Sequence, residues 1–140
     1  MQQKCSDMHG GQPACPSSNT PGDANDEALI KAGDDYVGGL YNHITASTTW
    51  AQGNNAIVIT WDEDDFAASP PPGCCDANPG GGHVATIVIT NHGPRGVQDA
   101  TPYNHYSLLH TIEDAFGLGC LQFTCDSTNV TPMTPLFAAS

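Results

Sequence analysis

Basic residues are scarce in this sequence. It contains three Lys or Arg residues against 15 Asp or Glu, and its formal net charge is −12. A protein that binds a nucleic-acid backbone needs clustered cations to neutralise the phosphates, and attraction to an anionic membrane surface also depends on Lys and Arg. The composition therefore argues against both kinds of partner. An anionic substrate stays compatible with this charge if bound metal ions reverse the local field.

The sequence also lacks any apolar run of the length that crosses a bilayer, which takes about 20 residues. Its first residues, MQQKCSD, do not contain the apolar core of a signal peptide, so we expect a mature segment or a fragment. At 140 residues the chain forms at most one domain. Its 15 Gly and 11 Pro predict a loop-rich structure.

No CxxC pair is present, which argues against a zinc ribbon. The six cysteines are Cys5, Cys15, Cys74, Cys75, Cys120 and Cys125. An even number of cysteines in loop-like settings indicates disulfides and an oxidising compartment. We therefore expect a secreted or extracellular protein. Cys5 with Cys15 and Cys120 with Cys125 are the preferred local pairs, although sequence alone does not fix the connectivity.

Hydrophobic periodicity predicts two helices and two strands. Apolar residues recur at three- and four-residue spacing over 26–46 and 106–116, which is typical of helices. Short runs rich in β-branched residues at 56–61 and 84–90 predict strands. Their nearly continuous apolar character favours a parallel sheet that is covered on both faces. The order helix, strand, strand, helix indicates an α/β layer architecture.

The second predicted helix has clear boundaries. Asn104 is a candidate N-cap, and Gly117 is a candidate C-terminal stop. The residues of this helix predicted to face the core are Leu108, Leu109, Ile112, Ala115 and Phe116. The apolar stripe predicted for the first helix consists of Leu29, Gly33, Tyr36, Val37, Leu40 and Ile44. Residues 118–140 are interpreted as a tail.

Four consecutive acids follow the first predicted strand, at 62–65. Ligands of open α/β sheets bind outside the carboxyl ends of the strands, and adjacent carboxylates repel one another unless a cation lies between them. Asp62 and Glu63 are therefore candidate metal ligands. The alternative is a solvated turn, which is our interpretation of Asp64 and Asp65.

The other candidate site residues are three histidines and one aspartate. His83 follows three glycines, which let the backbone approach an ion or anion closely. It is either a metal ligand or phosphate contact, or a polar residue that opens the strand. Asp7 and His9 lie in a predicted loop at 1–25 and can reach one ion, with an ordinary surface loop as the alternative. His105 precedes the second helix, where a capping or core role is the alternative to a catalytic one.

Four stretches in order resemble the phosphoesterase family of the alkaline-phosphatase superfamily, which includes bacterial non-specific phospholipases C and acid phosphatases. The stretches are Asp7-Met8-His9, Ile59-Thr60-Trp61-Asp62-Glu63, Gly82-His83-Val84, and Asn104-His105-Tyr106-Ser107-Leu108-Leu109, which continues as Thr111-Ile112-Glu113-Asp114. The last stretch is the most specific, and together they cover nearly the whole chain. The resemblance implies a doubly wound α/β sandwich and hydrolysis of phosphate esters.

The resemblance also implies roles for individual residues. In that superfamily a Ser or Thr attacks phosphorus, while divalent metals hold the nucleophile and the phosphate oxygens. The matched positions are Asp62 and Glu63 as metal ligands beside the nucleophile, Asp7, His9 and His83 as ligands or phosphate contacts on the other side, and His105 as a supporting position. His83 and His105 are thus the candidate catalytic residues. The expected metal is zinc if histidines join the carboxylates, or calcium or magnesium if the acids act alone.

The sequence departs from this family in two ways. The family's nucleophile and first acidic ligand come from an N-terminal half that has no counterpart here, so the resemblance implies a single partial domain, the C-terminal half of the catalytic domain. In addition, His110 stands where the family usually carries Arg. The alternative function is a non-catalytic extracellular structural or assembly module, which would self-associate or pair with the missing half through exposed strand edges. A carboxylate-rich cation binder would explain the acids but not the ordered motifs.

Overall fold

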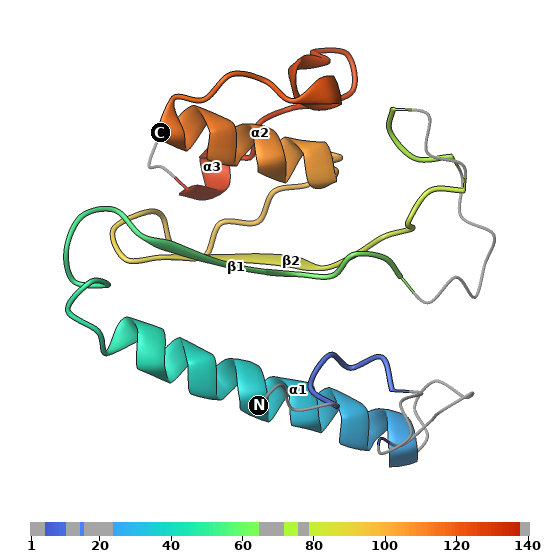
Figure 1. Cartoon of the computed structure of the whole chain (residues 1–140), viewed down its shortest axis with the longest axis vertical. Helices are drawn as coiled ribbons and strands as arrows, with labels where there is room; N and C mark the ends of the chain where they lie inside the picture. Colours follow the sequence, from blue (N-terminus) through green and yellow to red (C-terminus); the bar gives the residue numbers. More distant parts are fainter. Residues whose placement is uncertain (1–4, 11–14, 16–23, 65–71, 76–78, 138–140) are drawn as a thin grey trace. The chain divides into compact units, whose positions relative to one another are not determined.

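The computed structural model describes residues 5–10, 15, 24–64, 72–75 and 79–137 (Figure 1). The chain forms two compact units, Met1–Gly53 and Asn54–Ser140. Each unit is described by itself below. Among the helices that the structure describes, none combines the length and the apolar character that a membrane span requires.

The first unit contains the helix α1, Ala24–Thr45, which confirms the helix predicted at 26–46. Acidic residues stand in its first turn and His43 in its last, an arrangement that complements the helix dipole. Gly33 is buried in the middle of α1, where an added Cβ would overlap the side chain of Met8. The glycine is therefore explained by close packing of the preceding loop on the helix.

The predicted burial of the α1 stripe is only partly correct. Leu29 and Gly33 are buried, but Tyr36, Leu40 and Ile44 are each at least 40% exposed. Apolar spacing predicts a helix with one apolar face, but burial of that face also needs a covering element. The described part of the first unit contains no second helix or strand to provide one.

The second unit contains two paired strands, β1 (Ala56–Thr60) and β2 (Thr86–Thr90). They run antiparallel, with Ala56 opposite Thr90 and Thr60 opposite Thr86. The expected parallel pairing is therefore wrong for these strands, although both strands were correctly placed. An apolar run reports how deeply a strand is buried and carries no information on the direction of its neighbour. Ile87 is half exposed, so the predicted cover on both faces is also incomplete.

The two faces of this antiparallel pair differ in chemistry. Because side chains alternate along a strand, Ile57, Ile59, Ile87 and Ile89 share one face. The opposite face carries valine and threonine, and Thr90 on that face is buried. The short helix α3, Thr134–Phe137, contacts β2. At the end of the pair, the Thr60 and Thr86 hydroxyls are 2.9 Å apart and hydrogen-bonded.

The helix α2, His105–Phe116, ends where the sequence predicted and begins one residue earlier, so His105 is its first residue and does not precede it. The Asn104 side chain accepts a hydrogen bond from the Ser107 N–H, and the Ser107 hydroxyl accepts one from the Asn104 N–H, which forms a capping box. Gly117 ends the helix in the left-handed conformation. The predicted N-cap and the predicted C-terminal stop are both confirmed.

The predicted core face of α2 is wrong for Ile112, Ala115 and Phe116, which are exposed. Instead, the polar residues Ser107, Thr111 and Glu113 are buried. Thr111 and Glu113 form hydrogen bonds with the chain that follows the helix, whereas Ser107 bonds to Asn104 in the N-terminal cap. Thr111 Oγ1 donates to the Ser107 carbonyl and accepts from the Met133 N–H, each at 2.7 Å.

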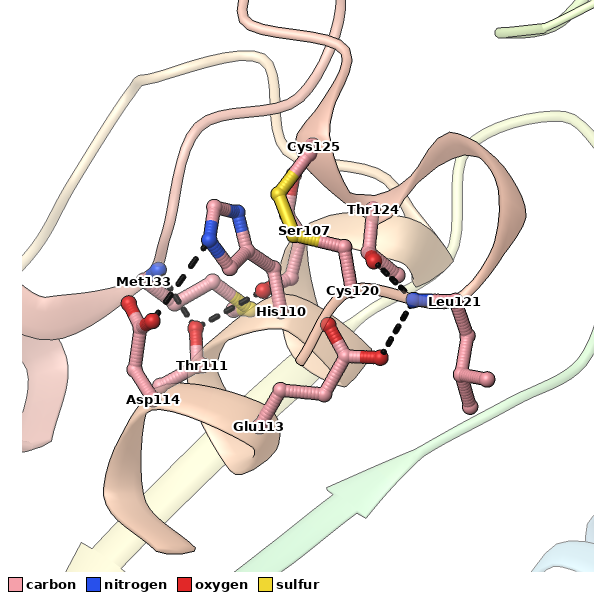
Figure 2. Close-up of polar contacts among 10 residues, drawn as sticks. All are labelled: Ser107, His110, Thr111, Glu113, Asp114, Cys120, Leu121, Thr124, Cys125 and Met133. Carbon is pink, nitrogen blue, oxygen red and sulfur yellow. Dashed lines mark hydrogen bonds and ion pairs between the residues drawn. A yellow bond between two sulfur atoms is a disulfide. The ribbon is translucent and has the colours of Figure 1, made fainter. Parts of the chain in front are cut away.

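Glu113 holds the loop after α2 (Figure 2). Its Oε1 and the Thr124 hydroxyl both accept from the Leu121 N–H, at 3.1 and 2.8 Å. The 3₁₀ helix η1, Gln122–Cys125, follows directly. Residues 118–137, interpreted from sequence as a tail, thus contain η1 and α3 and pack on α2 through buried polar groups.

Three disulfides are present in the structure. The bonds Cys5–Cys15 and Cys120–Cys125 confirm the two preferred local pairs. The third joins the adjacent residues Cys74 and Cys75, a pairing not among those preferred from the sequence. The Cys120–Cys125 bond closes the loop that contains Leu121. The N–H of Leu121 donates the hydrogen bond that Glu113 accepts.

Candidate functional site

A cavity of about 880 Å³ opens in the second unit, where β1 ends and β2 begins. Its walls come from the strand ends, the glycine-rich segment before β2, and the segment that leads into α2. Titratable or polar residues that line it include Asp62, His83, Asp99, Tyr103, Asn104 and His105. The structure thus brings three of the predicted site residues, Asp62, His83 and His105, to one cavity.

Asp62 is held in place by His105. The Nε2 atom of His105 lies 2.8 Å from the backbone carbonyl oxygen of Asp62. A carbonyl oxygen only accepts hydrogen bonds, so Nε2 carries the proton and donates it. In the neutral imidazole, Nδ1 therefore keeps the lone pair. This contact joins the first residue of α2 to the turn that follows β1.

The glycine-rich segment, residues 80–82, packs against the acidic turn, which consists of residues 62–64. The Asp64 N–H donates to the Gly81 carbonyl at 2.8 Å, and the His83 N–H donates to Asp64 Oδ2 at 3.1 Å. Gly82 has a φ of +79°, and an added Cβ there would overlap the Asp64 carboxylate. The glycines were expected to let the backbone approach an anion closely. In the structure, that anion is the Asp64 carboxylate.

The predicted roles of the acids after β1, and of His83, can be compared with this geometry. Asp64 is half-buried and hydrogen-bonded, so its interpretation as a merely solvated acid is wrong. Asp65 lies outside the described residues. Asp62 and Glu63 are exposed, and Asp62 is part of the cavity lining. His83 is exposed and precedes β2, with its N–H bound to Asp64.

Asp7 and His9 lie in the first unit, in a tight turn of their own. The His9 N–H donates to Asp7 Oδ1 at 3.1 Å, and both residues are exposed. Met8 between them has a positive φ of 65°, which is uncommon for a residue with a side chain. The two side chains stand on one short turn, and their predicted grouping with Asp62 stays a prediction.

The donor set is suited in chemistry to a divalent cation. Carboxylates of Asp62 and Glu63 are oxygen donors for calcium, magnesium or zinc, and the His83 imidazole is a zinc donor. Within the described parts of the chain, however, no three His, Cys, Asp or Glu side chains are grouped closely enough to hold a metal. Whether Asp62, Glu63 and His83 bind a metal therefore stays a prediction.

Asp99 and Tyr103 are cavity residues that the sequence reasoning missed. Asp99 accepts from the Thr101 N–H at 2.9 Å and from the Tyr103 hydroxyl at 2.8 Å. Hydrogen bonds from the Thr101 side chain and backbone, and from Tyr103, hold the pKa of Asp99 below its ordinary value. Burial, followed by the bond to Asp99, raises the pKa of Tyr103. An Asp two residues before a Thr is a signal for such a turn, but it is too common to mark a site.

Comparison with known proteins identifies the family of this chain. The model of the phosphoesterase family matches residues 18–119. A phosphatidylinositol-3-phosphatase from Mycobacterium tuberculosis (strain ATCC 25618 / H37Rv) is 28% identical over 120 residues, which cover 85% of this chain and 33% of the relative. The chain thus spans about a third of the length of that curated relative. No solved structure gives a significant match. Because the family model covers well over half of the sequence, the chain belongs to the phosphoesterase family.

Proposed function

We propose that this chain carries part of a metal-dependent site that hydrolyses phosphate esters. The observation that carries the proposal is the hydrogen bond between His105 and the Asp62 carbonyl, on the wall of the cavity that His83 also lines. It holds the backbone of Asp62 against the first residue of α2, which supports a defined position for the proposed ligand. Membership of the phosphoesterase family supports the reaction class.

The proposed roles follow from the chemistry of each group. Asp62 and Glu63 would hold a divalent cation, either zinc or calcium or magnesium, and His83 would ligate it or contact the phosphoryl group. When bound, such a cation neutralises phosphoryl oxygens and favours in-line displacement. His105 positions Asp62 through its Nε2 proton, which leaves Nδ1 as the atom able to accept a hydrogen bond.

Asp7 and His9 are proposed as the second set of ligands or phosphate contacts. They are exposed and two residues apart, so both side chains are accessible to one ion. The nucleophile is proposed to come from the preceding half of the catalytic domain, which would pair with this chain. Two disulfides matching the preferred pairs support the proposal that the protein is secreted.

The relatives suggest which substrates to test first. The family resemblance suggests phospholipase C or acid phosphatase activity. The curated relative is a phosphatidylinositol-3-phosphatase. We therefore propose that a phosphomonoester of an inositol lipid is the first substrate to test, followed by a phosphodiester lipid.

The experiment is metal analysis by mass spectrometry after the 140-residue chain has been equilibrated with Zn²⁺, Ca²⁺ or Mg²⁺. The variant Asp62→Ala/Glu63→Ala removes the proposed ligands. The matched control, Glu27→Ala/Asp34→Ala, removes two exposed acids on α1. Stoichiometric metal in the wild type and the control, lost in the first variant, is the expected result.

Absence of metal from the wild-type chain would contradict the proposal. The alternative would then lead: a non-catalytic extracellular structural or assembly module that self-associates or pairs with another chain. A positive result would be followed by hydrolysis assays with the preceding half of the domain added. Hydrolysis that needs both halves and the metal would identify this chain as part of the enzyme.

A further inference from the structure

The wall of the cavity includes one partner of a disulfide between two adjacent residues, Cys74 and Cys75. Cys74 lines the cavity, and both cysteines are half-buried. The candidate site residues Asp62, His83 and His105 line the same cavity. Neither the candidate metal ligands nor the proposed reaction gives this bond a role.

We propose that the Cys74–Cys75 disulfide is a reversible redox site that small thiols reduce, and that its reduction frees the backbone of Cys75 and so alters this wall of the cavity. The inference does not depend on phosphate-ester hydrolysis, because it concerns the chemistry of the two sulfur atoms. It assigns to the cavity a reactant class, low-molecular-weight thiols, that differs from the proposed substrate.

The spacing of the two cysteines argues against a purely structural role for the bond. A disulfide stabilises a fold mainly by restricting the unfolded chain, and this effect grows with the number of residues in the loop that it closes. The bonds Cys5–Cys15 and Cys120–Cys125 join residues 10 and 5 positions apart, whereas Cys74 and Cys75 are 1 position apart. Because coupling is reciprocal, the fold in turn protects the bond between neighbours least from reduction.

The backbone of Cys75 provides a second, independent observation. Its φ is +64°, in the left-handed region that residues with a Cβ seldom adopt. Such a conformation persists only where the surrounding structure holds it. A bond between neighbouring side chains is a constraint of this kind, because it closes a small ring that contains the peptide bond between Cys74 and Cys75. Reduction opens the ring, so Cys75 can return to a favoured conformation and shift Cys74 in the cavity wall.

The reduction consumes two thiols. A thiolate that enters the cavity attacks Sγ of Cys74, forms a mixed disulfide there, and releases the Cys75 sulfur as a thiolate that takes up a proton from water. A second thiolate attacks the outer sulfur of the mixed disulfide, and the small disulfide leaves while the Cys74 thiolate is protonated. The two small thiols thus supply two electrons and two protons, and they are oxidised to one disulfide.

The reduced pair can return to the disulfide without rearrangement of the fold. The two thiols belong to neighbouring residues, so they stay close together whatever the surrounding chain does. Exchange with an oxidised small disulfide re-forms the bond by the reverse steps. The pair can therefore follow the redox state of its surroundings in both directions.

The test is a titration of the native 140-residue chain with mixtures of reduced and oxidised dithiothreitol. Alkylation with iodoacetamide traps free thiols, and peptide mass spectrometry reports the state of each disulfide. We expect Cys74–Cys75 to be half reduced at a reduced-to-oxidised ratio about five- to tenfold lower than the other two bonds require, the factor that the difference in loop length gives. Return to oxidised dithiothreitol should restore the bond.

Amide NMR spectra recorded along the same titration test the effect on the cavity. Resonances of cavity-lining residues outside the disulfide, His83 among them, should shift as the bond is reduced, while those of α1 should stay unchanged. Cys74→Ser/Cys75→Ser should show the altered cavity resonances from the start and should not respond to the reductant. In the matched control, Cys120→Ser/Cys125→Ser, the cavity resonances should still respond.

Several results would overturn the inference. It is wrong if Cys74 and Cys75 are alkylated before any reductant is added, if their bond is reduced no more easily than the other two, or if it does not re-form. It is also wrong if reduction leaves the cavity resonances unchanged. None of these measurements needs a metal or a phosphate ester, so failure of the proposed function leaves the inference standing, and failure of the inference leaves the proposed function standing.

Discussion

His105 Nε2 and the backbone carbonyl oxygen of Asp62 lie 2.8 Å apart, although 43 residues separate them in the sequence. The bond fastens the N-terminus of α2 to the turn that presents the candidate ligands. Asp62 and Glu63 are both exposed, so burial of their side chains does not hold the turn. The hydrogen bond to His105 restrains the position of the turn directly. The site should therefore depend on His105 even if His105 never touches a substrate.

His105→Ala should lower the free energy of unfolding by about 1 kcal/mol, because it deletes one hydrogen bond at an exposed position. Urea denaturation measures this change. His105→Gln, whose amide can still donate, should recover part of the loss. His92→Ala, at an exposed histidine in the turn after β2, is the control. Equal stability of His105→Ala and the control would show that the contact contributes nothing.

Gly82→Ala should disturb the acidic turn more than a simple backbone substitution does. At a positive φ any Cβ costs about 1 to 2 kcal/mol, and at Gly82 the Cβ would also overlap the Asp64 carboxylate. Gly96→Ala is a matched control, because Gly96 has a φ of +66° and nothing within 4 Å of the added Cβ. Unfolding experiments should rank Gly82→Ala as the less stable variant, and the His83 amide resonance should move only in that variant. The reverse ranking would contradict the packing of Gly82 on Asp64.

Asp99 should make stability depend on pH in the acid range. Its pKa is lower in the folded chain, because Thr101 and Tyr103 donate hydrogen bonds to the charged form. A lowered pKa contributes stability above the unfolded value, and this contribution is lost as the pH falls through the folded value. Urea midpoints measured from pH 7 downward should fall less steeply in Asp99→Asn than in the wild type. Carbon-13 NMR of the Asp99 carboxyl should show titration below the ordinary aspartate range, and titration at or above that range would contradict the hydrogen bonding.

Glu113→Ala should destabilise the second unit by about 1 to 3 kcal/mol, because the buried carboxylate accepts from the Leu121 N–H. Glu113→Gln should cost less, because its amide oxygen can accept the same hydrogen bond from the Leu121 N–H and its neutral NH2 group replaces Oε2, which is buried without a hydrogen-bond partner among the described residues. Asp114→Ala removes only an exposed carboxylate 3.6 Å from His110 and should change stability by less than about 0.5 kcal/mol. Urea denaturation compares the three variants. A larger loss in Asp114→Ala than in Glu113→Ala would contradict the structural role of Glu113.

Local signals in the sequence predicted the helix and strand positions well. Asn104 marks the start of α2 because its side chain accepts a hydrogen bond from the first turn. Gly117 marks the end because a glycine adopts the left-handed conformation without a steric penalty. The disulfides Cys5–Cys15 and Cys120–Cys125 were also predicted from their spacing, whereas the bond between the adjacent residues Cys74 and Cys75 was not. Asp62, His83 and His105 were selected as site residues from motifs, and the structure places all three on one cavity.

Several features that the sequence did not reveal depend on contacts between segments that are separated along the chain. Strand direction is set by the path of the connection and not by the apolar run itself. Thr111 and Glu113 are buried because residues 121 and 133 return to them, and no helical periodicity encodes that return. Asp99 was overlooked because it lies between regular elements, where periodicity gives no signal.

The antiparallel pairing of β1 with β2 has a consequence for variation in this family. Thr60 and Thr86 are the last paired residues, so the chain leaves the sheet and returns to it at the same end. Asp62 and His83 therefore remain neighbours of that end whatever number of residues connects them. Doubling the length of such a connection costs only about 0.6 kcal/mol of loop-closure entropy. The number of residues in this connection can therefore change at little cost in loop-closure entropy, while Asp62 and His83 keep their places beside the sheet.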